Sequence, residues 1–286
     1  MKRVCCCVAI LLLTGAGVLA DKQTTEAGKQ VITARRTTKH VVLDGVFNPG
    51  EWSAAIPVHV DAVKPDMAPG LVPWQALPFA INPPDNQDDS SFTIRAMYDD
   101  TYLYIAVDVA DDKLFTDNPV FPWLDDVVEL YVDGDTESSD DWGLTAFQLD
   151  ITAAGEMVVY PDPIPGFVWD SAAGMRPRGY LVETQIRLDS IVTANGGAPG
   201  PGSKIGFNVT VGDDDTGLIG DPWFMGDTYM DDSYFHIPNP VVDSNPPFDD
   251  LNWFKNTPSS FIAWDGSSAN WVNLRETDWG TLYFAP

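Results

Sequence analysis

The chain of 286 residues is long enough for one large domain or two small ones. Acidic residues outnumber basic residues 42 to 16, which gives a formal net charge of −26. This charge argues against nucleic acid or an anionic membrane surface as the partner, because both need clustered Lys and Arg. Hydrophobic residues make up 44% of the chain and aromatic residues 12%, a composition that favours a packed core over disorder.

The N-terminus has the composition of a secretory signal peptide. Lys2 and Arg3 precede an apolar run from Val4 to Leu13, and small residues end at Ala20. The run is shorter than the ~20 apolar residues that span a bilayer, so we expect cleavage near Ala20 and no membrane partner afterwards. The mature protein would then be secreted, periplasmic or on the cell surface, and would start with a flexible leader over 21–30. All three cysteines lie in the signal peptide, so no disulfide or cysteine chemistry is expected.

From Val31 onward, short runs of alternating apolar residues bounded by turn residues are typical of β-strands. The first clear pair is Phe92–Tyr98 and Tyr102–Val109, and the acidic linker Asp99-Asp100-Thr101 predicts a hairpin turn between them. The further predicted strands are Val127–Val132, Phe147–Ile151, Met157–Tyr160, Tyr180–Leu188, Ile205–Val211, Phe261–Trp264 and Gly280–Phe284.

Helical periodicity is nearly absent, and the only helical turn expected lies at Pro49–Trp52 with Asn48 as its cap. Two long insertions, about 61–90 and 212–260, interrupt the strands, and loops of this length are usually functional or mobile. No repeat or composition break marks a second domain. The chain therefore predicts a single all-β domain over 31–286, an antiparallel β-sandwich of two sheets, immunoglobulin-like or jelly-roll-like, with long loop insertions.

Glu129 is an acidic residue inside an apolar predicted strand. Alternation places it on the same face as Val127 and Tyr131, opposite the apolar residues Val128, Leu130 and Val132. A carboxylate is costly to bury unless it is hydrogen-bonded, so Glu129 would face a groove or a cation. The alternative is a solvent-facing Glu on an edge strand.

Two tryptophans stand close to polar residues and outside the apolar runs. Trp123 precedes the strand of Glu129, and Trp271 follows Asn270 in a loop of Gly, Ser and Asn. Sugar sites pair an aromatic platform with carboxylates and amides, because sugars present flat C–H faces and many hydroxyls. Packing of each loop is the alternative role for either Trp, whereas the pair beside a strand Glu favours a sugar site with Asn270 as a hydroxyl contact.

Six short segments occur in an order that resembles a known family. They are Leu43-Asp44-Gly45 with Glu51-Trp52, Tyr98–Asp108, Asp126–Leu130, Gly179–Ile186, Ile205–Val209 with Asp213-Asp214-Asp215, and Trp279–Leu282. Together they resemble the family 9 carbohydrate-binding module, within the DOMON-like sandwich group, over residues 31–286. The resemblance implies a β-sandwich, a plant-type glycan such as xylan or cellulose as the ligand, and calcium as a structural ion.

The resemblance also implies roles for individual residues. Trp123 and Trp271 match the two positions whose rings hold a sugar between them, and Glu129 matches an acid that bonds the ligand. The sequence departs from the family at Gln148, which stands where an Arg would help to bind hydroxyls, and at Thr210, where a longer amide is expected. Gln148 is expected to bond sugar hydroxyls from this position.

Acidic runs in predicted turns are candidate calcium ligands, because Ca²⁺ takes carboxylate and carbonyl oxygens. The runs are Asp99-Asp100, Asp111-Asp112, Asp133 with Asp135, and Asp213, Asp214 and Asp215. Solvated charge in a turn is the alternative role for each of them. No organic cofactor is expected.

Together these features predict a secreted, non-catalytic protein that binds a polysaccharide or oligosaccharide, with a separate glycan-active enzyme as a conceivable partner. One alternative is a glycoside hydrolase or lyase with its acids in the long loops, 212–260 above all. Asp126 and Glu129 do not form its catalytic pair if they lie on opposite faces of one strand. Another alternative is a structural or adhesion domain on a cell surface, with its Trp residues buried.

Overall fold

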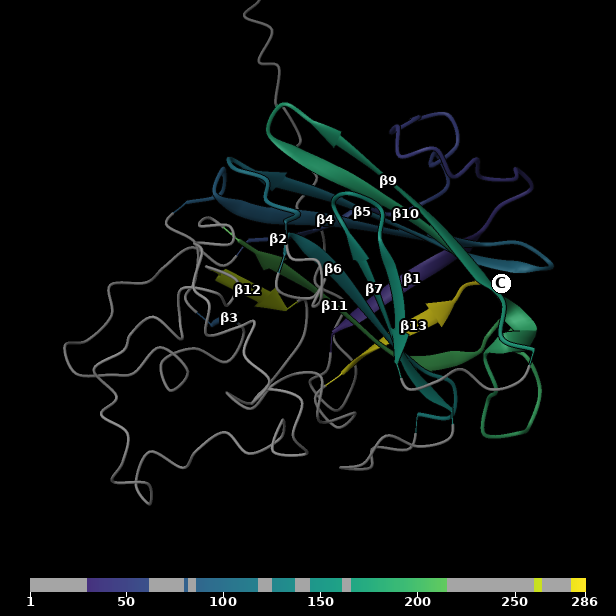
Figure 1. Cartoon of the computed structure of the whole chain (residues 1–286). Coiled ribbons are helices and arrows are strands. Elements are labelled where there is room, and N and C mark those ends of the chain that lie inside the picture. Colours follow the sequence, from purple (N-terminus) through teal and green to yellow (C-terminus); the bar gives the residue numbers. More distant parts are fainter. Residues whose placement is uncertain are drawn as a thin grey trace, which may run out of the picture.

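The protein is built from β-strands joined by turns (Figure 1). The computed structural model describes residues 30–61, 80–81, 86–117, 125–136, 145–160, 166–214, 260–263 and 279–286. Their strands are β1 (Val31–Arg36), β2 (Val58–Val60), β3 (Ala80–Ile81), β4 (Ser90–Tyr98), β5 (Tyr102–Asp111), β6 (Val127–Asp133), β7 (Ala146–Thr152), β8 (Met157–Tyr160), β9 (Trp169–Arg176), β10 (Gly179–Arg187), β11 (Lys204–Asp213), β12 (Ser260–Ala263) and β13 (Gly280–Phe284). Among these residues the single helical element is a 3-10 helix at Leu188–Ser190, and none of their helices could cross a bilayer. The expected signal peptide and most of both insertions lie outside the described residues.

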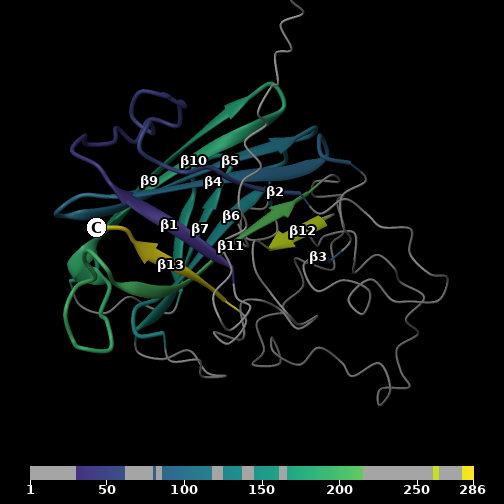
Figure 2. The same cartoon turned by 180° about the vertical axis from the view of Figure 1, so that it is seen from behind.

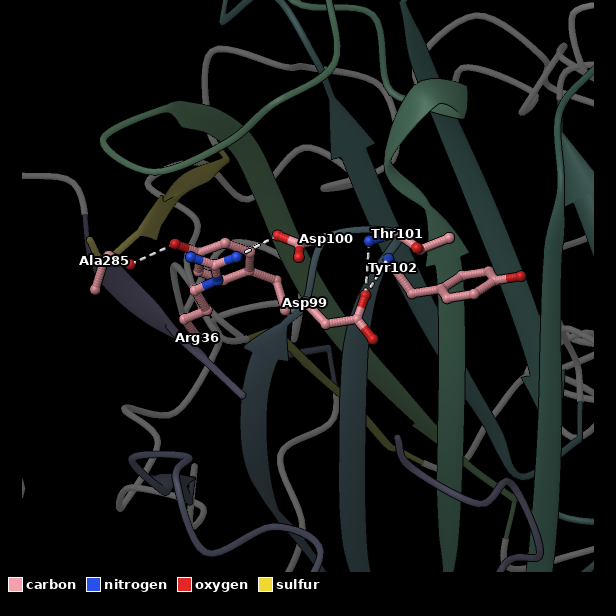
Figure 3. Close-up of polar contacts among 7 residues, drawn as sticks. Arg36, Asp99, Asp100, Thr101, Tyr102 and Ala285 are labelled. Carbon is pink, nitrogen blue, oxygen red and sulfur yellow. Dashed lines mark hydrogen bonds and ion pairs between the residues drawn. The ribbon is translucent and has the colours of Figure 1, made fainter. Parts of the chain in front are cut away.

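The hairpin predicted from the acidic linker is confirmed. β4 and β5 pair in antiparallel register, and Asp99 shapes the turn, because its Oδ1 accepts hydrogen bonds from the backbone N–H groups of Thr101 at 2.7 Å and Tyr102 at 2.8 Å (Figure 3). The neighbouring Asp100 forms an ion pair with Arg36 of β1. The Asp99-Asp100 pair thus closes a turn and ties it to the next strand.

The strands form one continuous mixed sheet, ordered β8-β7-β6-β11-β13-β1-β4-β5-β10-β9. β1 joins its two halves: Val31–Ala34 pairs in parallel with β13, and Arg35–Arg36 pairs in parallel with β4. The all-β prediction is confirmed, but the prediction of two separate antiparallel sheets is not. The physical reason is that one strand divides its hydrogen bonds between two neighbours, which local alternation does not reveal. The sheet curls until β4, β5, β9 and β10 lie across β6, β7 and β11 (Figures 1 and 2).

The main core lies between these two halves of the curled sheet. Val128, Leu130 and Val132 of β6 face it, as predicted from the alternation of apolar residues. They pack in one cluster with residues of the opposite half such as Ile105 and Val182, all at most 1% exposed. Burial of such side chains contributes roughly 1.5–3 kcal/mol each, so this cluster is the main source of stability.

Residues 41–55 cover the other face of β10, where Glu183 binds them. Glu183 Oε1 accepts a hydrogen bond from Trp52 Nε1 at 2.9 Å, and its Oε2 accepts from the backbone N–H groups of Gly45 at 3.1 Å and Asp44 at 3.2 Å. The turn expected here is present as a single hydrogen-bonded turn capped by Asn48, whose carbonyl oxygen accepts from the N–H groups of Glu51 at 3.0 Å and Trp52 at 3.3 Å and whose Oδ1 accepts from the N–H of Gly50 at 2.9 Å. We call Glu183, Trp52, Asp44 and Gly45 the Glu183 clasp.

Strand β9 was missed by the sequence analysis, as were the short β2 and β3. Its Ser171, Ala172, Ala173 and Gly174 lack the β-branched and aromatic residues that favour strands. Small residues are required there, because a Cβ on Gly174 would lie 2.2 Å from the carbonyl oxygen of Gly45. Gly45 has a φ of +69°, which other residues rarely adopt. Because β9 lies so close to the clasp, it has small residues in place of those that typically predict a strand.

Candidate functional site

The face of β6, β7 and β11 that points away from the main core is lined with polar residues. Glu129 on β6 lies opposite Asp150 of β7 on one side and Thr210 of β11 on the other. Gln148 lies two residues before Asp150 on β7 and is opposite Tyr131 of β6. Directly opposed residues of antiparallel strands share a face, so strand pairing brings these five residues together. We call this set the polar face.

Hydrogen bonds connect the polar face internally. Glu129 Oε2 accepts hydrogen bonds from the hydroxyl groups of Tyr131 and Thr210, both at 2.6 Å. Gln148 Nε2 donates to Asp150 Oδ1 at 2.7 Å. Glu129 is only 6% exposed and β6 lies between β7 and β11, so the alternative of a solvent-facing Glu on an edge strand is wrong.

Burial disfavours the charged forms of both carboxyl groups of this face. It raises the pKa of Glu129, although hydrogen bonds from Thr210 and Tyr131 act in the opposite direction. Burial first, and then the charge of Glu129, raise the pKa of Asp150 well above its ordinary value. The Glu129–Asp150 pair therefore costs stability whenever both groups are ionised.

This cost predicts a pH-dependent stabilisation by Asp150→Asn. A carboxyl group with a raised pKa in the folded protein stabilises it fully below the unfolded pKa of about 3.9, and this contribution is lost as the pH rises. We therefore expect the variant to gain stability over the wild type between pH 5 and pH 8, by about 1 kcal/mol or more at pH 8. Urea unfolding of both proteins at the two pH values, in calcium-containing buffer, measures the gain. The same change at exposed Asp170 is the control, and an equal gain at both pH values would contradict the prediction.

A second cluster consists of three buried carboxylates at the ends of three strands. Asp111 ends β5, Asp126 immediately precedes β6, and Asp213 ends β11. One carboxylate oxygen of each lies within 4.8 Å of the others, and all three residues are buried. Burial and then the charge of Asp111 raise the pKa of Asp126 to about 10, with a further contribution from Asp213. We call these three residues the acidic cluster.

A second set of carboxylates meets the same distance limit. It comprises exposed Asp117 and the buried Asp125 and Asp214. It adjoins the acidic cluster in the chain, and the backbone N–H of Asp214 donates to Asp126 Oδ1 at 2.9 Å. An oxygen-only donor set of this kind suits a hard cation such as Ca²⁺.

Only some of the predicted metal ligands lie in the two carboxylate sets. Asp213 and Asp214 lie in the two carboxylate sets, whereas Asp215 is outside the described residues. Asp133 belongs to neither set, and its Oδ1 accepts hydrogen bonds from Thr145 Oγ1 at 3.1 Å and from the N–H of Asp135 at 3.2 Å. The place of Asp126 beside Asp111 was not predicted, because convergence of strand ends leaves no local pattern in the sequence.

Of the predicted sugar-binding residues, Glu129 and Gln148 lie on the polar face, whereas Trp123, Trp271 and Asn270 are outside the described residues. Asp150 was not predicted as a site residue, although its spacing of two from Gln148 places both side chains on one face of a strand.

Comparisons with known proteins agree with the resemblance in the sequence. A family model described as carbohydrate family 9 binding domain-like matches residues 72–239. The chain is 29% identical over 183 residues to exoglucanase XynX of Acetivibrio thermocellus, covering 59% of this chain and 16% of that protein. It is also 29% identical over 185 residues to endo-1,4-beta-xylanase A of Thermoanaerobacterium saccharolyticum, covering 57% and 14% of the two chains. The chain thus spans less than a fifth of the length of these relatives.

The solved structures support the fold. A carbohydrate-binding module of family 9 from Caldicellulosiruptor kristjanssonii in complex with cellotriose superposes with a TM-score of 0.55 at 15% identity, over 89% of this chain and 93% of that one. The same module in complex with glucose gives the same TM-score and identity, over 89% and 95%. At this level of identity the similarity establishes the architecture alone.

Proposed function

Because the chain belongs to the carbohydrate family 9 binding domain-like family, we propose that it is a secreted, non-catalytic protein that binds a plant-type polysaccharide or oligosaccharide such as xylan or cellulose. The observation that carries this proposal is the polar face, on which Glu129 and Gln148 stand on neighbouring strands. The exoglucanase and xylanase relatives and the cellotriose and glucose complexes of the structural neighbour support the ligand class. The names of these relatives, an exoglucanase and a xylanase, support a glycan-active enzyme as a partner.

Glu129 and Gln148 would bond sugar hydroxyls. Tyr131 and Thr210 both donate to Glu129 Oε2, so Oε1 is the oxygen that would accept a hydroxyl of the ligand. Their hydrogen bonds hold the carboxylate in one orientation, which reduces the entropy lost on binding. Trp123 and Trp271 would supply the aromatic platforms that stack on the sugar faces.

A second candidate function, glycoside hydrolysis, is favoured by one observation. Glu129 and Asp150 are opposed carboxyl groups on one face, and the pKa of Asp150 is raised well above its ordinary value. Glycosidases use two carboxyl groups, one of them a protonated acid. Binding is preferred because the matched family is defined by carbohydrate binding, and because hydrogen bonds within the polar face already engage both carboxyl groups.

We also propose that the acidic cluster holds a calcium ion, with Asp117, Asp125 and Asp214 as a second candidate site. The donors fit the ion, since all are carboxylate oxygens, and the three residues of the acidic cluster are all buried with oxygens within 4.8 Å of one another. A bound cation would offset the repulsion that raises the pKa of Asp126. It would also tie the ends of β5, β6 and β11 together, close to the strands that carry the polar face.

Isothermal titration calorimetry with xylo-oligosaccharides and cello-oligosaccharides tests the binding function. We expect the protein exported after cleavage near Ala20 to bind at least one of the two series. The Trp123→Ala/Trp271→Ala double variant should lose binding beyond detection, and Glu129→Gln should weaken it by about tenfold, the effect of one hydrogen bond to a charged group. Unchanged binding in the double variant, or absence of binding to a wide glycan panel, would contradict the proposal. Release of reducing ends from these glycans would support the hydrolase instead.

A further inference from the structure

The polar face opens to solvent at the edge strand β8. β8 pairs with β7 alone among the described strands, and its Tyr160 lies directly opposite Gln148. The two side chains therefore share a face. Gln148 is only 8% exposed, whereas Tyr160 is 54% exposed.

We propose that Tyr160 is an additional sugar-stacking residue, which extends the glycan site across β8 and selects for longer oligosaccharides. The inference rests on the proposed function and assigns a further contact to the same face. A tyrosine ring packs against the C–H face of a sugar, while its hydroxyl group can bond a sugar hydroxyl. The glycan unit on Tyr160 would follow the unit held at Glu129 and Gln148.

The position of Tyr160 fits a second unit of the same chain. Glu129, on β6, is two strands away from β8, and strands are spaced by about 4.8 Å. Tyr160 therefore stands roughly 10 Å from Glu129 across the sheet, too far to contact the same sugar ring. Gln148 and Asp150 of β7 lie between them, so a bound chain would cross polar groups that can bond its hydroxyls.

The composition of β8 supports a ligand at this edge. Proteins usually protect edge strands with charged residues or proline against pairing with another chain. β8 consists of Met157, Val158, Val159 and Tyr160, and both end residues are exposed. An uncharged edge with an exposed aromatic residue is a surface that a ligand can cover.

Titration with xylose, glucose and their β-1,4-linked oligosaccharides up to the hexasaccharide tests the inference. We expect Tyr160→Ala to weaken binding of the oligosaccharides about fivefold to tenfold, the effect of one aromatic contact, and to leave monosaccharide binding unchanged. Tyr160→Phe should keep most of the affinity. Met157→Ala is the matched control, because Met157 is exposed on the same strand but lies three positions away, on the other face.

The outcomes separate this inference from the proposed function. If the wild type binds none of the glycans, the proposed function fails and the inference fails with it. If the wild type binds and Tyr160→Ala binds every length with unchanged affinity, the extension at β8 is wrong while the function stands. If Tyr160→Ala instead converts a dimer into a monomer in size-exclusion chromatography with glycan affinity unchanged, β8 is a contact between two copies of the chain, and the inference is overturned.

Discussion

Removal of calcium with EDTA should lower the melting temperature by about 10 °C, because a tightly bound ion contributes roughly 4 kcal/mol when its concentration far exceeds its dissociation constant. The physical cause is the acidic cluster. Asp111, Asp126 and Asp213 bring three buried carboxylates within 4.8 Å of one another, and without a cation their charges repel each other at low effective dielectric. Differential scanning calorimetry with EDTA, and again after addition of excess CaCl₂, measures the loss and its recovery.

For the variant Asp126→Asn we expect opposite changes in stability in the absence and in the presence of calcium. Without calcium the variant should be more stable than the wild type, because Asn removes a carboxyl group whose ionised form is disfavoured by burial and by Asp111. With calcium it should be less stable, because a ligand is lost. Asp112→Asn is the matched control, since Asp112 is adjacent to Asp111 but exposed and outside both carboxylate sets. Equal melting temperatures of the wild type in EDTA and in calcium would show that the acidic cluster binds no ion.

Glu183→Ala should lower the free energy of unfolding by about 3–5 kcal/mol. The Glu183 side chain is fully buried and accepts hydrogen bonds from Trp52 Nε1 and from the backbone N–H groups of Asp44 and Gly45. Alanine would leave these donors without their acceptor and open a cavity beneath residues 41–55. Urea unfolding in the presence of calcium measures the loss.

Two further variants make this prediction specific. Glu183→Gln keeps the shape and one good acceptor, so it should lose less than half as much stability as Glu183→Ala. Glu156→Ala removes an exposed acid and should change stability by less than about 0.5 kcal/mol. Glu183 lies on β10, outside the polar face, so folded Glu183→Ala should still bind glycan. If Glu183→Ala is as stable as the wild type, the clasp has no structural role.

Local patterns predicted the strands and the direction of their side chains. The alternation along β6 placed Glu129 and Tyr131 on one face and Val128 and Leu130 on the other, and the structure has this arrangement. The acidic linker between β4 and β5 predicted their hairpin. Both inferences succeed because backbone geometry alone fixes the period of two along a strand and the residue preferences of a short turn.

Other predictions failed where one segment is shaped by contact with another. β9 was not predicted as a strand, since its small residues are needed for close approach to Gly45. Two separate sheets were expected, whereas β1 joins both halves. In each case the cause is a contact with a segment that is distant in the chain.

The all-β class, the family resemblance and the acid at Glu129 can be inferred from the sequence alone, because they depend on residue type and on spacing within short segments. The folded arrangement was needed to show that Asp150 and Thr210 flank Glu129, that Asp111, Asp126 and Asp213 converge, and that Tyr160 borders the polar face. These neighbours result from strand order and register, which are set by packing between residues that are distant in the chain. No local period of the sequence encodes such pairing.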